Sequence, residues 1–187
     1  MDEENKESGR SGNSRKLELQ RKINFHNNVV HLYEITCKES QNNQLKKYLL
    51  VMEYIDGNSL QDYLKENFTK LTWEDKYKLA YQLICVVSHL HDKGNVHGDL
   101  HSGNILTHRN TIKLADLGNL FQPYSNKMRD VYSIGVLLWE ISSGQPPFKD
   151  ESYDTDLMMQ ISQGYREKII SNTSIDYSNL YIGNYNF

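Results

Sequence analysis

The pattern of apolar positions predicts a long helix between Thr72 and Gly94. Thr72 can cap the N-terminus of this helix together with Asp75, and a basic residue followed by Gly94 suits its C-terminus. Between these ends, apolar and aromatic residues recur at spacings of three and four, the period of one helical face. We expect that face to be buried, and it consists of Trp73, Tyr77, Ala80, Ile84, Val87 and His91.

A second helix is apolar on every side. The run DVYSIGVLLWEISSG begins at Asp130 and ends at Gly144. A helix of this kind belongs in the middle of a core, because it has no polar face to turn toward water. We expect further helices at residues 59–66 and, one or two of them, within residues 154–187.

Runs rich in β-branched and aromatic residues predict strands on both sides of the first helix. Upstream, residues 28–36 and 45–55 fit two strands joined by a polar loop, and the second ends at the turn signal Asp56-Gly57. Downstream, short strands at residues 105–107 and 112–114 bracket a His-Arg-Asn turn. The chain therefore mixes strands and helices.

The first residues differ in composition from the rest of the chain. Residues 1–14 combine charge, serine and glycine with no apolar residue after Met1, so they predict a disordered tail. Residues 15–25, RKLELQRKINF, fit a short amphipathic helix. We therefore place the start of the folded region at residue 15.

Charge and composition exclude some classes of partner. A net charge of -3 and a pI near 6.2 give no broad basic face, so we expect no nucleic-acid partner. No apolar run approaches membrane-spanning length, so we expect no membrane segment. Cys37 and Cys85 stand far apart without a CxxC pair, which suggests free thiols in a cytoplasmic protein, with the nucleus as the alternative compartment.

Three oxygen-bearing side chains lie near one another in HGDLHSGNIL and the following ADLG. They are Asp99, Asn104 and Asp116. Phosphoryl transfer needs a positioned base and divalent cations more than covalent chemistry. A carboxylate such as Asp99 can accept a hydroxyl proton, while the oxygens of Asn104 and Asp116 are hard ligands suited to Mg²⁺.

Residues 97–118 resemble the catalytic and metal-binding loops of eukaryotic-type protein kinases. HGDLHSGN is similar to the kinase loop H-R-D-L-x-x-x-N, and the ADLG segment contains an equivalent of D-F-G. DVYSIGVLLWE resembles the buried central helix of the kinase large lobe, whose leading aspartate, here Asp130, anchors the catalytic loop. The resemblance implies an α+β, protein-kinase-like fold with a mainly helical large lobe and a partial antiparallel sheet in the small lobe.

The resemblance also implies a division of the chain. Residues 15–187 become a partial kinase domain, in which residues 15–52 are a small-lobe remnant, 53–57 a hinge and 58–187 the large lobe. A two-stranded sheet without neighbours is marginally stable, so we expect residues 15–52 to be the least stable ordered region.

ATP and Mg²⁺ are the cofactors that the resemblance implies. In the nucleotide site, Asp99 is then the catalytic base, and Asn104 and Asp116 hold Mg²⁺. The residues around adenine are Met52 as gatekeeper, the backbone groups of Glu53 and Ile55 as hydrogen-bonding partners, and Leu106 beneath the ring. The implied reaction is transfer of the γ-phosphoryl group to a serine or threonine, or a tyrosine, of a protein substrate. The oligomeric state is left open.

The sequence departs from the kinase pattern at several places. No G-x-G-x-x-G and no V-A-I-K lysine precede the hinge, and only thirteen residues separate Asp116 from Asp130, too few for a full activation segment. Gly98 stands where H-R-D has arginine, and His101 stands where serine/threonine kinases commonly carry lysine. The alternative function is therefore a catalytically inactive pseudokinase or scaffold that binds a partner protein.

The segment His97-x-Asp99-x-His101 permits another interpretation. In isolation this spacing fits a transition-metal site of a hydrolase. The kinase resemblance implies instead that His97 is a packing residue that hydrogen-bonds the backbone.

Overall fold

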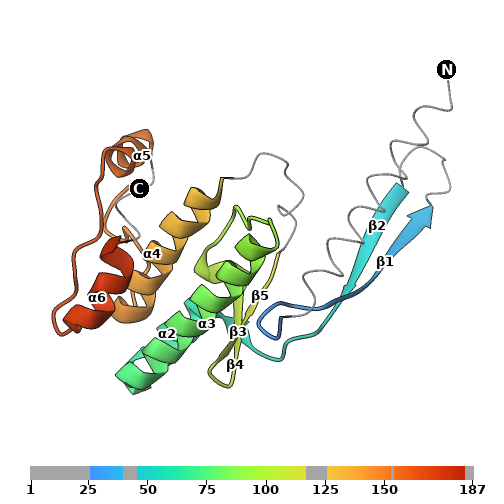
Figure 1. The fold of residues 1–187 in the computed structure, drawn as a ribbon, viewed down its shortest axis with the longest axis horizontal. Coiled ribbons are helices and arrows are strands. Elements are labelled where there is room, and N and C mark those ends of the chain that lie inside the picture. The colour runs from blue at the N-terminus through green and yellow to red at the C-terminus, as the bar shows by residue number, and fades with distance from the viewer. Residues whose placement is uncertain (1–25, 40–45, 117–125, 153, 184–187) are drawn as a thin grey trace.

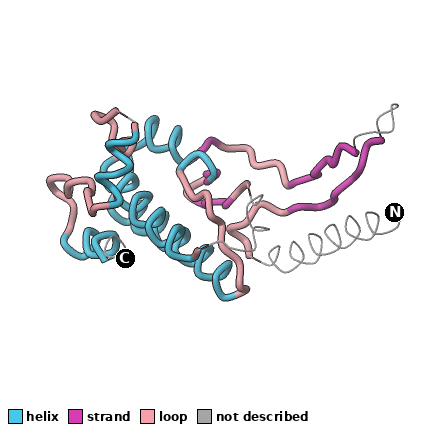
Figure 2. The backbone as a smooth tube through the Cα atoms, turned by 90° about the horizontal axis from the view of Figure 1, so that it is seen from above, coloured by secondary structure: helices cyan, strands magenta, loops and turns pink. Residues whose placement is uncertain are grey.

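The computed structural model describes residues 26–39, 46–116, 126–152 and 154–183 (Figure 1). The expected disordered tail and first amphipathic helix lie outside these residues. The described elements form two antiparallel sheets and a group of helices, with β1 and β2 extending away from the helices in both views (Figures 1 and 2). None of the helices in the described residues is long and apolar enough to cross a membrane.

The longest helix, α3 (Trp73–Asp92), begins as the sequence predicts. The Thr72 hydroxyl accepts a hydrogen bond from the Asp75 N–H, and the Asp75 carboxylate accepts one from the Thr72 N–H, which completes a capping box. Lys93 caps the other end through its N–H to the His89 carbonyl. Both predicted boundaries of this helix are therefore confirmed.

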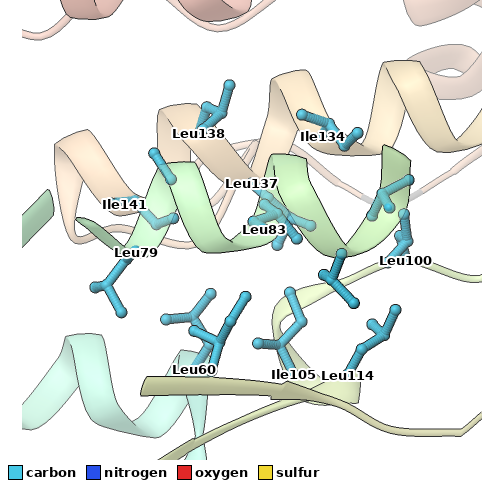
Figure 3. Packing of buried hydrophobic residues seen from close by; sticks show 14 of the residues in the cluster. Leu60, Leu79, Leu83, Leu100, Ile105, Leu114, Ile134, Leu137, Leu138 and Ile141 are labelled. Carbon is cyan, nitrogen blue, oxygen red and sulfur yellow. The ribbon is translucent and has the colours of Figure 1, made fainter. Parts of the chain in front are cut away.

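The predicted buried face of α3 is partly wrong. Tyr77 lies at the surface, 37% exposed, and its hydroxyl hydrogen-bonds that of Ser174. Trp73, Ile84 and His91 are only half-buried. Apart from Lys76, whose Nζ donates to the Ser142 carbonyl, the buried positions form an aliphatic stripe next to the aromatic one, and they are Leu79, Ala80, Leu83, Val86, Val87 and Leu90. The aliphatic stripe is buried because its side chains fill the space between α3, α4 and the sheet (Figure 3).

Helix α4 (Lys127–Ser143) is the buried central helix that its all-apolar sequence predicts. It begins three residues before Asp130, where the Asn126 side chain accepts from the Met128 N–H. It ends at Gly144, whose φ of 68° favours glycine and where a Cβ would collide with the Phe68 ring. Leu137 and Ile141 of α4 lie on the side of this helix toward α3, whereas Leu138 points away from α3 (Figure 3), and all three belong to the buried core.

The remaining helices are short. Helix α2 (Leu60–Asn67) is capped by Ser59 and agrees with the predicted helix at residues 59–66. Its buried residues, Leu60 and Leu64, join the core beside α3. Beyond α4, α5 (Thr155–Ser162) and α6 (Ile175–Ile182) confirm helical structure near the end of the chain.

A three-stranded sheet lies between the helices and the outer hairpin (Figure 1). Its strands are β3 (Asn58–Ser59), β4 (Ile105–His108) and β5 (Thr111–Leu114), paired antiparallel in the order β3-β4-β5. The turn between β4 and β5 has positive φ at both central residues, 50° at Arg109 and 58° at Asn110. Two left-handed residues of this kind form a tight hairpin with the right twist for its strands.

A separate two-stranded sheet pairs β1 (Leu32–Glu39) with β2 (Lys46–Met52). Both strands were predicted, but β1 begins later than residue 28. Val30 N–H instead donates to the Leu114 carbonyl at 2.9 Å, and Leu114 N–H donates to the Asn28 carbonyl at 2.7 Å. The chain before β1 thus pairs with β5, which attaches the outer hairpin to the rest of the fold.

Candidate active site

A buried carboxylate holds the segment that carries Asp99. Asp130, at the start of α4, is fully buried and accepts hydrogen bonds from the backbone N–H groups of His97, at 2.8 Å, and Gly98, at 2.7 Å. The Nε2 atom of His91, near the end of α3, lies 2.9 Å from the same carboxylate. Gly98 has a φ of 75°, a conformation that glycine adopts without strain. Asp130 thereby fixes the loop before Asp99 to two helices.

His97 is a buried packing residue. Its Nδ1 accepts from the Asp99 N–H at 3.3 Å, so the ring proton of the neutral imidazole lies on Nε2. Nε2 then donates to the Ala115 carbonyl at 3.0 Å. Since both nitrogens are used within the loop, His97 is not available to a metal ion, and the transition-metal interpretation is wrong for this residue.

Asn104 connects the other two oxygen-bearing residues of the site. Its side-chain N–H donates to the Asp99 carbonyl at 3.0 Å, and its own carbonyl accepts from the Ala115 N–H at 2.9 Å. Asp116 follows directly, exposed and with a φ of 51°. Asp99 is also exposed, so both carboxylates face solvent. The structure therefore gathers the segments of Asp99, Asn104 and Asp116 where β4 begins and β5 ends.

The predicted hinge follows β2 and leads into β3. The Gly57 N–H donates to the Ile55 carbonyl at 3.0 Å, and a Cβ at Gly57 would collide with the Thr107 carbonyl. The Thr107 hydroxyl donates to the Asn58 carbonyl at 3.1 Å. These contacts hold the hinge against β4.

Leu106 links the hinge side of the site to the carboxylate side. It lies in β4, two residues after Asn104, and pairs with Ser59 beyond the hinge. Its neighbours Ile105 and Thr107 are buried, whereas Leu106 on the opposite face of the strand is only half-buried. Met52, the last residue of β2, is 53% exposed. Of the residues predicted to contact adenine, Met52 and Leu106 thus have apolar side-chain surface exposed to solvent.

Glu53 has a structural role that the sequence did not predict. Its carboxylate lies 2.9 Å from the Lys113 ammonium through both oxygens and also accepts from the His31 N–H at 3.1 Å. Burial would raise the pKa of Glu53, but these hydrogen bonds hold it below its ordinary value. The Glu53 N–H donates to the His31 carbonyl at 2.7 Å, which leaves the Glu53 carbonyl as its backbone group for a ligand.

Two cavities lie beside the Asp99 loop. One, of about 490 Å³, is lined by Asp99, Arg129 and Tyr132 among others. The second, of about 300 Å³, includes His101 and the buried Glu140 of α4. Burial raises the pKa of the Glu140 carboxyl to about 7, against the effect of a hydrogen bond with Ser102. Sequence reasoning missed Glu140, although a carboxylate in the middle of an apolar helix could have indicated it.

A scan of protein families gives the same class as the fold and the site. The family described as protein tyrosine and serine/threonine kinase matches residues 1–129. The chain therefore belongs to the protein kinase family, and its α+β fold is the kinase fold expected from the sequence.

Several curated relatives are serine/threonine or related protein kinases. CBL-interacting serine/threonine-protein kinase 21 of Arabidopsis thaliana is 30% identical over 157 residues, which cover 70% of this chain and 36% of that protein. NUAK family SNF1-like kinase 2 of Rattus norvegicus is 31% identical over 81% of this chain and 28% of that protein. Calcium/calmodulin-dependent protein kinase type 1 of Caenorhabditis briggsae is 33% identical over 76% of this chain and 45% of that protein. The chain spans about a third of the length of the first of these relatives.

Proposed function

We propose that this chain takes part in transferring the γ-phosphoryl group of Mg·ATP to a serine or threonine hydroxyl of a protein substrate. The proposal rests on the contacts of Asn104. Its side-chain N–H donates to the Asp99 carbonyl, and its own carbonyl accepts from the N–H of Ala115, the residue before Asp116. This linkage groups a candidate base with two candidate metal ligands. Such grouping is what phosphoryl transfer requires of a protein.

Asp99 is the proposed base. Its carboxylate is exposed beside the larger cavity, where a substrate hydroxyl can approach, while its backbone N–H and carbonyl are held by His97 and Asn104. A base fixed at its backbone and open at its carboxylate can accept a proton without losing its position.

Asn104 and Asp116 are the proposed Mg²⁺ ligands. Because the Asn104 side-chain N–H group donates to the Asp99 carbonyl, the amide oxygen is the atom that can bind a cation. Bound Mg²⁺ would neutralise phosphate charge. Asp116 supplies a carboxylate from the next strand end.

Adenine is proposed to lie between the hinge and β4. Met52 and Leu106 offer partly exposed apolar surface for the ring. The Glu53 carbonyl and the backbone of Ile55 are the proposed polar partners, because the Glu53 N–H is already bonded to His31. The choice of serine or threonine follows the name of the Arabidopsis relative.

Thermal unfolding with and without Mg·ATP tests the nucleotide site. A ligand at about a hundred times its dissociation constant adds about 2.7 kcal/mol to the free energy of unfolding. We expect a rise in Tm that requires Mg²⁺ and is lost in Asp116→Ala. If wild type and Asp116→Ala show the same Tm with and without Mg·ATP, the proposal is wrong.

A further inference from the structure

The two ring nitrogens of His101 face different parts of the candidate active site. Nδ1 accepts a hydrogen bond from the Gly103 N–H at 3.2 Å, which caps the short 3₁₀ turn η2 (Ser102–Asn104). Nε2 lies 4.0 Å from Oδ2 of Asp99. The ring therefore stands between the turn that ends in Asn104 and the carboxylate of Asp99.

The cap fixes which nitrogen carries the proton. Because Nδ1 accepts from Gly103, the neutral imidazole of His101 carries its proton on Nε2. Nε2–H is then a donor on the side of the ring that faces Asp99. A separation of 4.0 Å is longer than a hydrogen bond, and a small side-chain rotation or one bridging water closes it.

Glycine at position 103 leaves the space that the ring occupies. A Cβ at Gly103 would lie 3.0 Å from both Cε1 and Nδ1 of His101, tighter than ordinary contacts. The backbone of His101 is extended, with φ of -156° and ψ of 165°, as a cap position requires. The orientation of His101 therefore depends on the backbone and on its neighbour, although 56% of its side chain is exposed.

We propose that His101 is a positioning residue of the kinase reaction, whose Nδ1 caps the turn bearing Asn104 and whose Nε2–H orients the Asp99 carboxylate. The inference rests on the proposed function. An oriented carboxylate spends more time aimed at the substrate hydroxyl, so its loss lowers kcat. Where the cap on the turn bearing Asn104 is kept, nucleotide affinity is expected to change little, because His101 lies on the carboxylate side of the site and not at the hinge.

Four substitutions separate the two roles of His101. His101→Asn keeps a side-chain oxygen that can accept from the Gly103 N–H, but it is too short to replace Nε2. His101→Lys keeps a donor long enough to reach Asp99 but cannot accept from Gly103. His101→Ala removes both functions. Gly103→Ala changes no ionisable residue, but its Cβ shifts the His101 ring.

The experiment measures kcat, KM for Mg·ATP and Tm for the full chain and each variant. We expect kcat to fall about tenfold or more in His101→Asn and Gly103→Ala, with KM within about twofold in His101→Asn, which keeps the cap on the turn that bears Asn104. We expect His101→Lys to have a higher kcat than His101→Ala and a Tm no higher than that of His101→Asn.

Two results overturn the inference while the proposed function stands. One is a kcat of His101→Asn equal to that of wild type, because capping is then the whole role of the residue. The other is a kcat of His101→Lys no higher than that of His101→Ala. A wild-type chain without a Mg·ATP-dependent rise in Tm and without phosphoryl transfer overturns the proposed function, and this inference with it.

Discussion

Glu140 is predicted to make folding less favourable as the pH rises. Its carboxyl is 3% exposed within α4, and burial, opposed by a hydrogen bond with Ser102, raises its pKa from 4.5 to about 7. Between these two values the folded chain keeps the proton that the unfolded chain releases. The free energy of unfolding therefore falls as the pH rises from 4.5 to 7 and is constant with respect to this group above that range.

The size of the Glu140 effect follows from the two pKa values. At about 1.4 kcal/mol per pKa unit, the difference corresponds to at most about 3 kcal/mol above pH 7. Glu140→Gln keeps the shape and a hydrogen-bonding partner for Ser102 but cannot ionise. We expect the variant to lie within about 1 kcal/mol of wild type near pH 5 and to be more stable by about 2 to 3 kcal/mol at pH 8.

Urea unfolding of wild type and Glu140→Gln across pH 5 to 8 checks this prediction. Asp150→Asn, at an exposed position after α4, is the matched control and should show no such trend. A stability difference between Glu140→Gln and wild type that stays constant over the range would refute the reasoning, since a neutral and an ionised carboxyl would then be equally tolerated in the core.

Three further predictions concern stability. Asp130→Ala leaves the His97 and Gly98 N–H groups without their acceptor and should cost about 1 to 3 kcal/mol for each in urea unfolding, whereas an equal cost for Asp130→Asn would contradict this assignment. The His26 ring lies 4.9 Å from that of His89, and burial and this neighbour lower the pKa of His26. The stability that the neutral His26 contributes to the folded state should therefore be lost as the pH falls below about 6.5. The protection factor of the Val30 amide, which corrects its exchange rate for the intrinsic pH effect, should fall as the pH is lowered from 7.5 to 5.5, and His89→Phe should reduce this change without abolishing it, because burial is the larger cause. The β1–β2 hairpin should exchange faster than α4, and equal protection of the two would refute its predicted low stability.

Local signals predicted helix ends and turns well, because the groups that form them are close in sequence. The Thr72 and Asp75 capping box and the glycine after α4 both formed as expected. The buried face of α3 could not be predicted in the same way. Aromatic and aliphatic stripes have the same helical period, and the positions of α4 and of the sheet decide that Leu83 is buried and Tyr77 exposed.

The candidate site shows the same limit. Asp99, Asn104 and Asp116 were found because the order of the motifs is visible in the sequence. The contacts that hold the site depend on residues far apart in the chain, as in the Glu53 to Lys113 ion pair. Such pairs require the tertiary fold before they can be seen.

Phosphoryl transfer itself is the most direct test of the central claim. Purified wild type and Asp99→Asn are incubated with Mg·ATP labelled in the γ-phosphoryl group and a generic protein substrate, and phosphoserine and phosphothreonine are quantified. The account predicts incorporation by wild type and a loss of at least about a hundredfold in Asp99→Asn, the contribution expected of a general base. Equal incorporation by the two proteins, or none by a wild type whose Tm rises with Mg·ATP, would contradict it.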